Sequence, residues 1–460
     1  MSAIWWIRRD IRLSDNPTLA KALQQGDGVI PLFILDPRLN QKEPSQRHAF
    51  LFEGLNVLDE QLKQKGSALV VRSGEPGQVL HDLMLQTGAT AIYAEEDFTP
   101  YATKRDERIA AALPFVRVHG QTVIHPLLVQ KSDGKPYTVF TPFSRAWKAL
   151  LNQDLTSIPT PKQIPSPILP KSDALPQCEG SQLFPSGERV ALQRLSLFAE
   201  SAIFQYNEQR NRVDLDGTSS LSPYLRFGMI SLRQAVMAAK QAEQRASQLG
   251  VSTQGAATWL NELIWREFYI SILFHFPYVS KKAFNPKYQN IKWSNNTAEF
   301  EAWKVGRTGM PIVDAAMRQL LATGWMHNRA RMIVASFLVK DLLINWQWGE
   351  RWFFETLLDG DPAANNGGWQ WTAGTGTDAA PYFRVFNPIL QAQKFDPSGD
   401  YVRRWVPELA DVPASYLQTP WKMPVEIQQK SGCLIGIDYP DLIVDHDEAR
   451  KRVLRVYKES

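Results

Sequence analysis

The first part of the chain alternates short apolar runs with amphipathic stretches. Four runs have the length and composition of buried strands, namely residues 4–7, 29–35, 69–72 and 91–94, and residues 49–65 form a helical pattern between two of them. This alternation predicts a parallel, Rossmann-like α/β sheet within residues 1–130. The first run ends in Trp6-Ile-Arg-Arg-Asp instead of a Gly-x-Gly-x-x-Gly turn, so we expect no dinucleotide site there.

The middle of the chain separates two kinds of pattern. Residues 159–185 contain seven prolines among polar residues, a composition that excludes a helix or a central strand. Beyond about residue 190 the apolar positions take helical spacing, at residues 257–274, 311–323, 326–344 and 350–358. We therefore predict an α/β domain over residues 1–130, a connector over 131–195 and an all-helical domain over 196–460.

Composition narrows the class of protein. A chain of 460 residues with 44% apolar and 21% charged residues is expected to form two globular domains. Its two cysteines, Cys178 and Cys433, and its scattered histidines indicate neither a disulfide framework nor a metal site. We see no signal peptide and no apolar run of membrane-spanning length, and we expect a cytoplasmic monomer. The net charge of +4 is compatible with a polyanionic partner without requiring one.

Residues 359–378 concentrate acids, amides, glycines and tryptophans. Paired acids can hold hydroxyl groups, neutral amides can bond a heteroatom edge, and glycines let the backbone approach a flat ring. The residues concerned are Asp359, Asp361, Asn365, Asn366, Gly367, Gly368, Trp369 and Trp371. The segment is therefore either a cofactor cradle or a glycine-rich loop whose tryptophans fill the core.

Three further segments carry candidate chemistry. Thr218-Ser-Ser-Leu-Ser-Pro places four hydroxyls ahead of a predicted helix, as a helix cap or as a phosphate seat. In residues 257–274, one helix face carries Trp259, Glu262, Trp265 and Arg266. These residues form either an ion pair among aromatic side chains or the wall of a cavity that contains a buried carboxyl. In residues 326–344, Asn328 and Met332 share a face, with Arg331 beside them.

These segments together resemble the photolyase and cryptochrome family. The likeness extends from Trp6-Ile-Arg-Arg-Asp-Ile-Arg-Leu-Ser-Asp-Asn to Phe386-Asn-Pro and Trp405-Val-Pro-Glu-Leu, nearly the whole chain. It is strongest to microbial class I photolyases of cyclobutane pyrimidine dimers. The resemblance implies a light-dependent carbon–carbon lyase that acts on DNA, in which FAD, as the anionic hydroquinone, gives an electron to the dimer.

The resemblance also implies cofactor-binding roles. It assigns the FAD pyrophosphate to Thr218, Ser219, Ser220, Leu221 and Ser222, with Tyr206 nearby. Asn365 would lie against flavin N5, Asp361 at the isoalloxazine edge, and Asp359 near the ribityl or ribose hydroxyls in a pair with Arg331. Asn328 would orient the cofactor region, and Trp259 and Arg266 would lie close to the cofactor or its bound substrate.

The implied substrate residues lie in the lesion pocket or on DNA phosphates. Glu262, Trp265, Met332 and Trp371 would shape the pocket, where a desolvated Glu262 would have a raised pKa and donate to a thymine carbonyl. Arg329 and Arg384 would contact phosphates, as would Lys394, Arg403 and Arg404. Trp369, Trp346 and Trp293 match the family's tryptophan chain for photoreduction, although core packing explains each indole singly.

Two side-chain choices separate the family's classes. Photolyases of six-four photoproducts carry histidines at the positions of Asn328 and Met332, and plant cryptochromes carry an aspartate at that of Asn365, so repair of cyclobutane dimers is favoured. A cryptochrome-like photoreceptor without lyase activity is the alternative. An ordinary flavin oxidoreductase is a third hypothesis, and it is disfavoured because the sequence shows no nicotinamide site. In the first domain the family holds an antenna pigment that is a folate, a deazaflavin or a flavin, or is absent. Arg9, Asp36, Asp97 and residues 101–106 look most like the deazaflavin type, and ordinary surface pairs explain them about as well.

Overall fold

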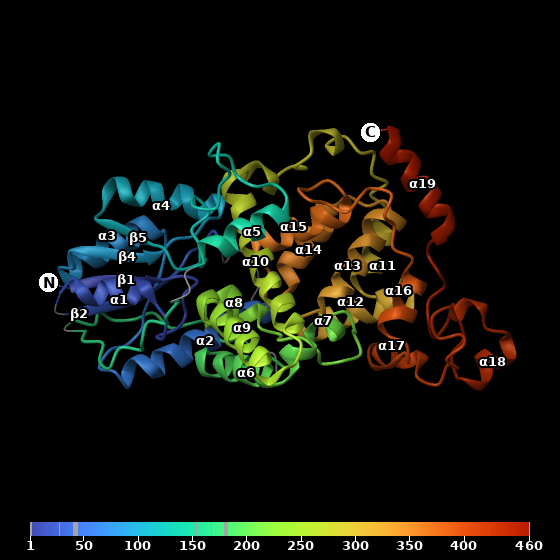
Figure 1. Cartoon of the computed structure of the whole chain (residues 1–460), viewed down its shortest axis with the longest axis horizontal. Coiled ribbons are helices and arrows are strands. Elements are labelled where there is room, and N and C mark those ends of the chain that lie inside the picture. Colours follow the sequence, from blue (N-terminus) through green and yellow to red (C-terminus); the bar gives the residue numbers. More distant parts are fainter. Residues whose placement is uncertain are drawn as a thin grey trace. The chain divides into compact units, whose positions relative to one another are not determined.

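The computed structural model describes residues 2–26, 28–39, 45–151, 155–166, 168–178 and 183–459. The chain forms two compact units (Figure 1). The first comprises Met1–Asn207 and Ser219–Pro277, and the second comprises Glu208–Thr218 and Tyr278–Ser460. A search of the described helices finds none that is both long and apolar enough to cross a membrane.

The first unit is built on a five-stranded parallel sheet with strand order β3-β2-β1-β4-β5. The strands are β1 (Ser2–Ile7), β2 (Gly28–Leu35), β3 (Val70–Ser73), β4 (Ala91–Glu95) and β5 (Phe115–Val118). Every residue of β1 is buried, because β1 lies between two neighbouring strands and both of its faces are covered. The predicted α/β fold is therefore confirmed, and the sheet gives one edge to which all strands bring their carboxyl ends.

The four strands predicted from apolar runs are present, with bounds that differ by one or two residues. The fifth strand escaped the prediction. Val116 and Arg117, in the middle of β5, are exposed because β5 is an edge strand, so it lacks a continuous apolar run.

The helices of this unit lie beside the sheet and beyond it (Figure 1). Contacts link α1 to β1, β2 and β4, link α4 to β5, and join α10 to α5 and α9. The helices are α1 (Pro17–Gln24), α2 (Gln46–Lys63), α3 (Pro76–Thr87), α4 (Pro100–Ala112), α5 (Phe140–Leu150), α6 (Glu188–Glu200), α8 (Ser222–Phe227), α9 (Leu232–Leu249) and α10 (Gln254–His275). Between Leu150 and Glu188 the described residues contain no helix or strand, in keeping with their proline content.

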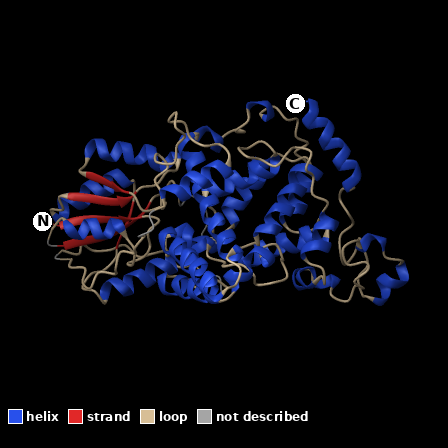
Figure 2. Ribbon diagram, in the orientation of Figure 1, coloured by secondary structure: helices blue, strands red, loops and turns tan. Residues whose placement is uncertain are grey.

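The second unit is helical, and the strands drawn in red in Figure 2 all belong to the first unit. Its longer helices are α11 (Thr297–Lys304), α12 (Pro311–Thr323), α13 (Asn328–Ser336), α14 (Trp346–Thr356), α15 (Pro362–Ala373), α16 (Pro388–Phe395) and α19 (His446–Glu459). Shorter helices are α17 (Asp400–Trp405) and α18 (Val425–Lys430). The predicted all-helical character of this part of the chain is confirmed.

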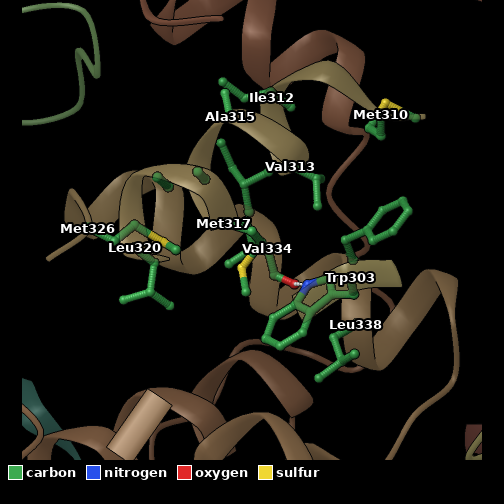
Figure 3. Close-up of a cluster of buried hydrophobic side chains, with 14 of the residues drawn as sticks. Trp303, Met310, Ile312, Val313, Ala315, Met317, Leu320, Met326, Val334 and Leu338 are labelled. Atoms are coloured by element: carbon green, nitrogen blue, oxygen red, sulfur yellow. Dashed lines mark hydrogen bonds between the residues drawn. The ribbon is translucent and has the colours of Figure 1, made fainter. Parts of the chain in front are cut away.

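The core of this unit surrounds Trp303, which is fully buried (Figure 3). Its indole Nε1 donates to the carbonyl oxygen of Val334 at 3.1 Å, so the one polar atom of the ring is satisfied. Met310, Val313 and Met317 pack in the same cluster. This core fixes α12 against α13, and α13 and α15 carry most of the candidate site residues of the unit.

Two predicted helical segments differ from the structure. The prediction of a single helix over residues 326–344 is wrong. Helix α13 ends at Ser336, and a π-helical turn, Phe337–Asp341, follows it. The sequence left two interpretations of residues 359–378, a cofactor cradle or a glycine-rich loop. In the structure most of these residues form α15. A helix there presents its amides in a fixed register instead of on an irregular chain.

Candidate functional site: a flavin cradle and a basic surface

The start of α15 is fixed by Asp361. Its carboxylate Oδ1 accepts from the backbone N–H groups of Ala363 at 3.0 Å and Ala364 at 3.2 Å, and Pro362 occupies the first turn. Asp361 is buried. The side chain therefore caps the helix, and its predicted place at the isoalloxazine edge stays a prediction.

Asp359 lies just before this cap and forms an ion pair with Arg331. Arg331 Nη2 donates to Asp359 Oδ2 at 2.8 Å, so the predicted pair between these residues is present in the structure. The other carboxylate oxygen, Oδ1, is buried and has no hydrogen-bond partner among the described residues. A buried carboxylate oxygen without a donor is costly. A cofactor hydroxyl would satisfy it, and in this respect the residues present fit FAD.

The two amides of α15 bond to α14. Asn365 Nδ2 donates to the main-chain oxygen of Glu350 at 2.8 Å, and Asn366 Nδ2 donates to Glu350 Oε1 at 2.8 Å. Burial raises the pKa of Glu350 to about 7. Sequence reasoning missed Glu350, because nothing in its local pattern shows that it faces α15.

On α13, Asn328 and Met332 share a face as predicted. Asn328 is exposed, Met332 is half-buried, and Asn328 Nδ2 lies 4.0 Å from Met332 Sδ. His327, just before the helix, accepts the N–H of Arg329 with Nδ1 at 3.1 Å. Burial and the nearby Arg329 and Arg331 lower the pKa of His327 to about 4, so it is neutral at pH 7.

Arg329 lies near other arginines, among them Arg210. Its guanidinium donates to Asn211 Oδ1 at 2.7 Å and lies 4.4 Å from the ring centroid of Phe395. Burial, and then the positive charge of Arg210, lower the pKa of Arg329 to about 10. Arg210 was not among the predicted residues, because it stands 119 positions earlier in the chain and only the fold brings it close.

The other arginine candidates differ in what their side chains do. Arg384 is exposed in the loop before α16, beside the exposed Phe383. Arg403 instead donates to the main-chain oxygens of Ser398, Ala410 and Val412. Arg403 therefore holds its own loop together, which favours a structural role over a phosphate contact.

The three tryptophans of the proposed electron route all lie in the second unit. Trp346 and Trp369 are buried in its main core, and Trp293 is half-buried at 6.2 Å from Tyr457, edge to face. Trp369 packs edge to face on Phe353 at 5.0 Å. Burial of this kind suits both core packing and electron transfer. Trp371, two positions on, is half-buried.

In the first unit, α10 carries the predicted aromatic face. Trp259 is buried and lies 5.1 Å from the ring of Phe198. Trp265 is half-buried and stacks in parallel on Phe140, with ring centroids 3.8 Å apart and an interplanar angle of 4°. One face of the Trp265 indole is thus covered by Phe140, and its ring plane is fixed.

The buried carboxyl of α10 is Glu267. Trp147 Nε1 donates to Glu267 Oε2 at 2.5 Å, the N–H of Val123 donates to Oε1, and burial raises the pKa of Glu267 to about 7. Glu262 and Arg266 are only half-buried, and Arg266 donates to the carbonyl oxygen of Leu225 at 3.3 Å. The role of Glu262 in the lesion pocket stays a prediction.

The proposed phosphate segment leads into α8. Ser220 has a positive φ of 48°, an unusual conformation for a residue other than glycine, and Leu221 is buried just before the helix. The division between the two units falls between Thr218 and Ser219, and Tyr206 is buried against Phe198 at 5.9 Å. The positive φ of Ser220 marks a turn of the backbone just ahead of α8.

The carboxyl edge of the sheet gathers the residues predicted for an antenna. Arg9 lies 3.9 Å from Asp97, Tyr101 donates to Asp36, and the guanidinium of Arg105 lies 4.6 Å over the ring of Trp6. These side chains bond to one another across the ends of β1, β2 and β4, the edge where parallel sheets bind ligands.

Two family models match the chain. Residues 3–165 match the DNA photolyase model, and residues 259–459 match the FAD binding domain of DNA photolyase. These matches cover most of the chain, which therefore belongs to the DNA photolyase family and carries its FAD-binding domain.

Individual relatives agree with this assignment over the full length. A deoxyribodipyrimidine photo-lyase of Agrobacterium fabrum is 39% identical, covering 99% of this chain and 97% of the relative. A class III photolyase from Agrobacterium tumefaciens superposes with a TM-score of 0.93 at 38% identity, covering 100% of this chain and 97% of the other. A Synechocystis cryptochrome superposes with a TM-score of 0.90 at 31% identity, covering 99% of each chain. Membership of class I stays a prediction.

Proposed function

We propose that this protein is a light-dependent DNA repair enzyme that splits cyclobutane pyrimidine dimers into monomers. The observation that carries the proposal is the neutral amide and acid set of α13 and α15, inside the residues that match the FAD-binding domain of DNA photolyase. When bound and reduced, FAD supplies an electron donor that light excites. The remaining roles belong to side chains.

The cofactor-binding residues hold FAD by its polar groups. Asp359 accepts a cofactor hydroxyl with its unsatisfied Oδ1, and Arg331 holds that carboxylate in place through the pair at 2.8 Å. Asn365 faces N5 without adding charge, which suits an anionic reduced flavin. The further cofactor contacts are assigned to Asp361, Asn328, Trp259, Arg266, Tyr206, Thr218, Ser219, Ser220, Leu221 and Ser222.

The substrate is DNA, and the protein binds it as a monomer. Arg329 and Arg384, together with Arg210, neutralise phosphates of the DNA backbone. The lesion, flipped out of the duplex, contacts half-buried side chains of the pocket. Trp265, which is half-buried and stacked on Phe140, stacks on a base, and Met332 and Trp371 supply apolar contact. Glu262 donates to a thymine carbonyl, a role that requires it to be protonated.

Two further roles concern electrons and light. Trp369, Trp346 and Trp293 carry electrons to an oxidised flavin. The sheet edge at Arg9, Asp36, Asp97 and Tyr101 holds a second chromophore, a deazaflavin or a folate, in the domain that we place at residues 1–130.

A cryptochrome-like photoreceptor without lyase activity is the second candidate, and the similarity to the Synechocystis cryptochrome favours it. The test mixes the purified, reduced protein with an oligonucleotide that carries one thymine dimer and follows thymine absorbance under blue light and in the dark. Recovery in the light alone supports repair. With reduced flavin bound, an absence of recovery would leave the photoreceptor.

A further inference from the structure

Glu350 holds two consecutive amides of α15 with two different atoms. Its main-chain oxygen accepts from Asn365 and its side-chain Oε1 accepts from Asn366, each at 2.8 Å. Glu350 lies at the middle of α14, and its side chain is half-buried. One residue of α14 therefore bonds to the residue predicted to face flavin N5 and also to that residue's neighbour.

The orientation of each amide follows from its partners. A main-chain carbonyl oxygen only accepts hydrogen bonds, so the atom of Asn365 at 2.8 Å from it is the nitrogen, and Oδ1 points elsewhere. Asn366 Nδ2 donates to Val279 O at 3.0 Å as well as to Glu350, while its oxygen accepts from Gln370 Nε2 at 3.1 Å.

Gln370 completes this network. Its Nε2 also donates to Val279 O at 3.0 Å, and its Oε1 accepts the N–H of Phe284 at 2.8 Å. Because main-chain donors and acceptors fix both ends, flipping either amide would set oxygen against oxygen. The network has one arrangement, and the Glu350 carboxyl is its link to α14.

We propose that Glu350 is a positioning residue for the flavin. Through Asn366 its carboxyl clamps α15 to α14, which keeps Asn365 within reach of the Glu350 main-chain oxygen and leaves Asn365 Oδ1 as the atom that faces N5. The inference rests on the proposed function, since it takes Asn365 to be the neighbour of N5.

The orientation of the Asn365 amide affects which redox state of the flavin is favoured. Reduced flavin carries a hydrogen on N5, which an amide oxygen accepts, whereas oxidised flavin has a lone pair there, which the same oxygen repels. Holding Oδ1 toward N5 therefore favours the reduced cofactor. If the clamp is lost, the amide can turn its NH₂ group to N5, which favours the oxidised cofactor.

The carboxyl acts as a hydrogen-bond acceptor, which a glutamine side chain can replace. Glu350→Gln retains an acceptor oxygen for Asn366, and Glu350→Leu removes it at similar size. Burial raises the pKa of Glu350 to about 7, so the wild-type carboxyl is partly neutral near pH 7 and the loss of charge in Gln is small. Asn366→Ala breaks the same bond from the other side, and Glu355→Gln, on the same helix, is the matched control.

The experiment measures the midpoint potential of bound FAD by spectroelectrochemistry, with the FAD dissociation constant and the melting temperature of each variant. At a fixed applied potential, Glu350→Leu and Asn366→Ala should each lower the ratio of reduced to oxidised flavin about tenfold. This corresponds to a decrease of about 30 mV in the midpoint potential of a two-electron couple. The double variant should shift no further than Asn366→Ala alone, because Asn366→Ala already removes the bond that Glu350→Leu removes. Glu350→Gln and Glu355→Gln should match the wild type.

The outcomes separate the positioning role from the proposed function. Unchanged potentials in Glu350→Leu and Asn366→Ala, with FAD bound, would overturn the positioning role even if light-driven repair is intact. A wild type that binds no FAD would overturn the proposed function instead. If Glu350→Leu fails to fold, Asn366→Ala tests the same bond, and an additive double variant would also contradict the proposal.

Discussion

The stack of Trp265 on Phe140 should control how well the protein distinguishes damaged from undamaged DNA. The rings lie parallel at 3.8 Å between centroids, and Phe268 and Tyr269 contact the indole at 5.5 Å, which holds Trp265 in one plane. Phe140→Ala removes the parallel partner and lets the indole rotate. Trp265 would then have to be ordered again when a base stacks on it.

The magnitude follows from the stacked pair. Such a pair contributes about 0.5–1.5 kcal/mol beyond the area that it buries, so affinity for dimer-bearing DNA should fall about 2- to 12-fold. The effect should not exceed that of Trp265→Ala, which removes base stacking worth about 1–3 kcal/mol. Phe140→Tyr keeps an aromatic face and should behave like the wild type.

Fluorescence anisotropy in the dark, with matched oligonucleotides and one fixed salt concentration, measures the effect. Phe140→Ala should weaken binding to the dimer-bearing strand and leave binding to the undamaged strand unchanged. An equal loss on both strands, or none on either, would refute the reasoning, because it would remove Trp265 or its support from lesion recognition.

Three further predictions follow from single side chains. Burial lowers the pKa of Lys340 to about 7 from its ordinary value of 10.5, so between these pH values the unfolded state keeps a proton that the folded state has released. Stability should therefore rise with pH by up to about 1.4 kcal/mol per pH unit. Lys340→Met should abolish that slope in urea unfolding between pH 7 and 9, and equal slopes would contradict the shift. Gly349→Ala places a Cβ 2.1 Å from Trp369 Cη2 and should cost about 1–3 kcal/mol of unfolding free energy; unchanged denaturation midpoints would argue against this packing. Arg329→Ala should reduce the salt dependence of DNA binding by about 0.9 in log–log slope, equally for damaged and undamaged DNA, and an unchanged slope would take Arg329 off the phosphates.

The fold could be predicted where local patterns decide it. Helix α12 has the predicted bounds, because Pro311 stands in its first turn and Gly324, at a φ of 66°, ends it. The π-helical turn after Ser336 could not be predicted, since Phe337–Asp341 is buried on every side and shows no periodic face from which a change of helix could be seen.

Some residues of the candidate site could be expected from the sequence and others could not. The pair of Arg331 and Asp359 was expected from the resemblance and is present in the structure. Arg331 lies on α13, and Asp359 lies in the turn before α15, the helix that carries Asn365. Glu350 and Arg210 were not, because Glu350 acts partly through its main chain and Arg210 comes close only through tertiary folding. For the same reason the sequence did not show that Glu267 of α10 is buried, where Trp147 and Val123 donate to its carboxylate.

The most direct test of the central claim compares three oligonucleotides of one sequence, carrying a thymine dimer, a six-four photoproduct or no damage. Each is illuminated with blue light in the presence of the reduced protein and analysed by chromatography for restored thymines, with dark samples alongside. The account predicts restoration of the cyclobutane dimer alone, and in the light alone. Restoration of the six-four product, or none from any strand with reduced FAD bound, would contradict it.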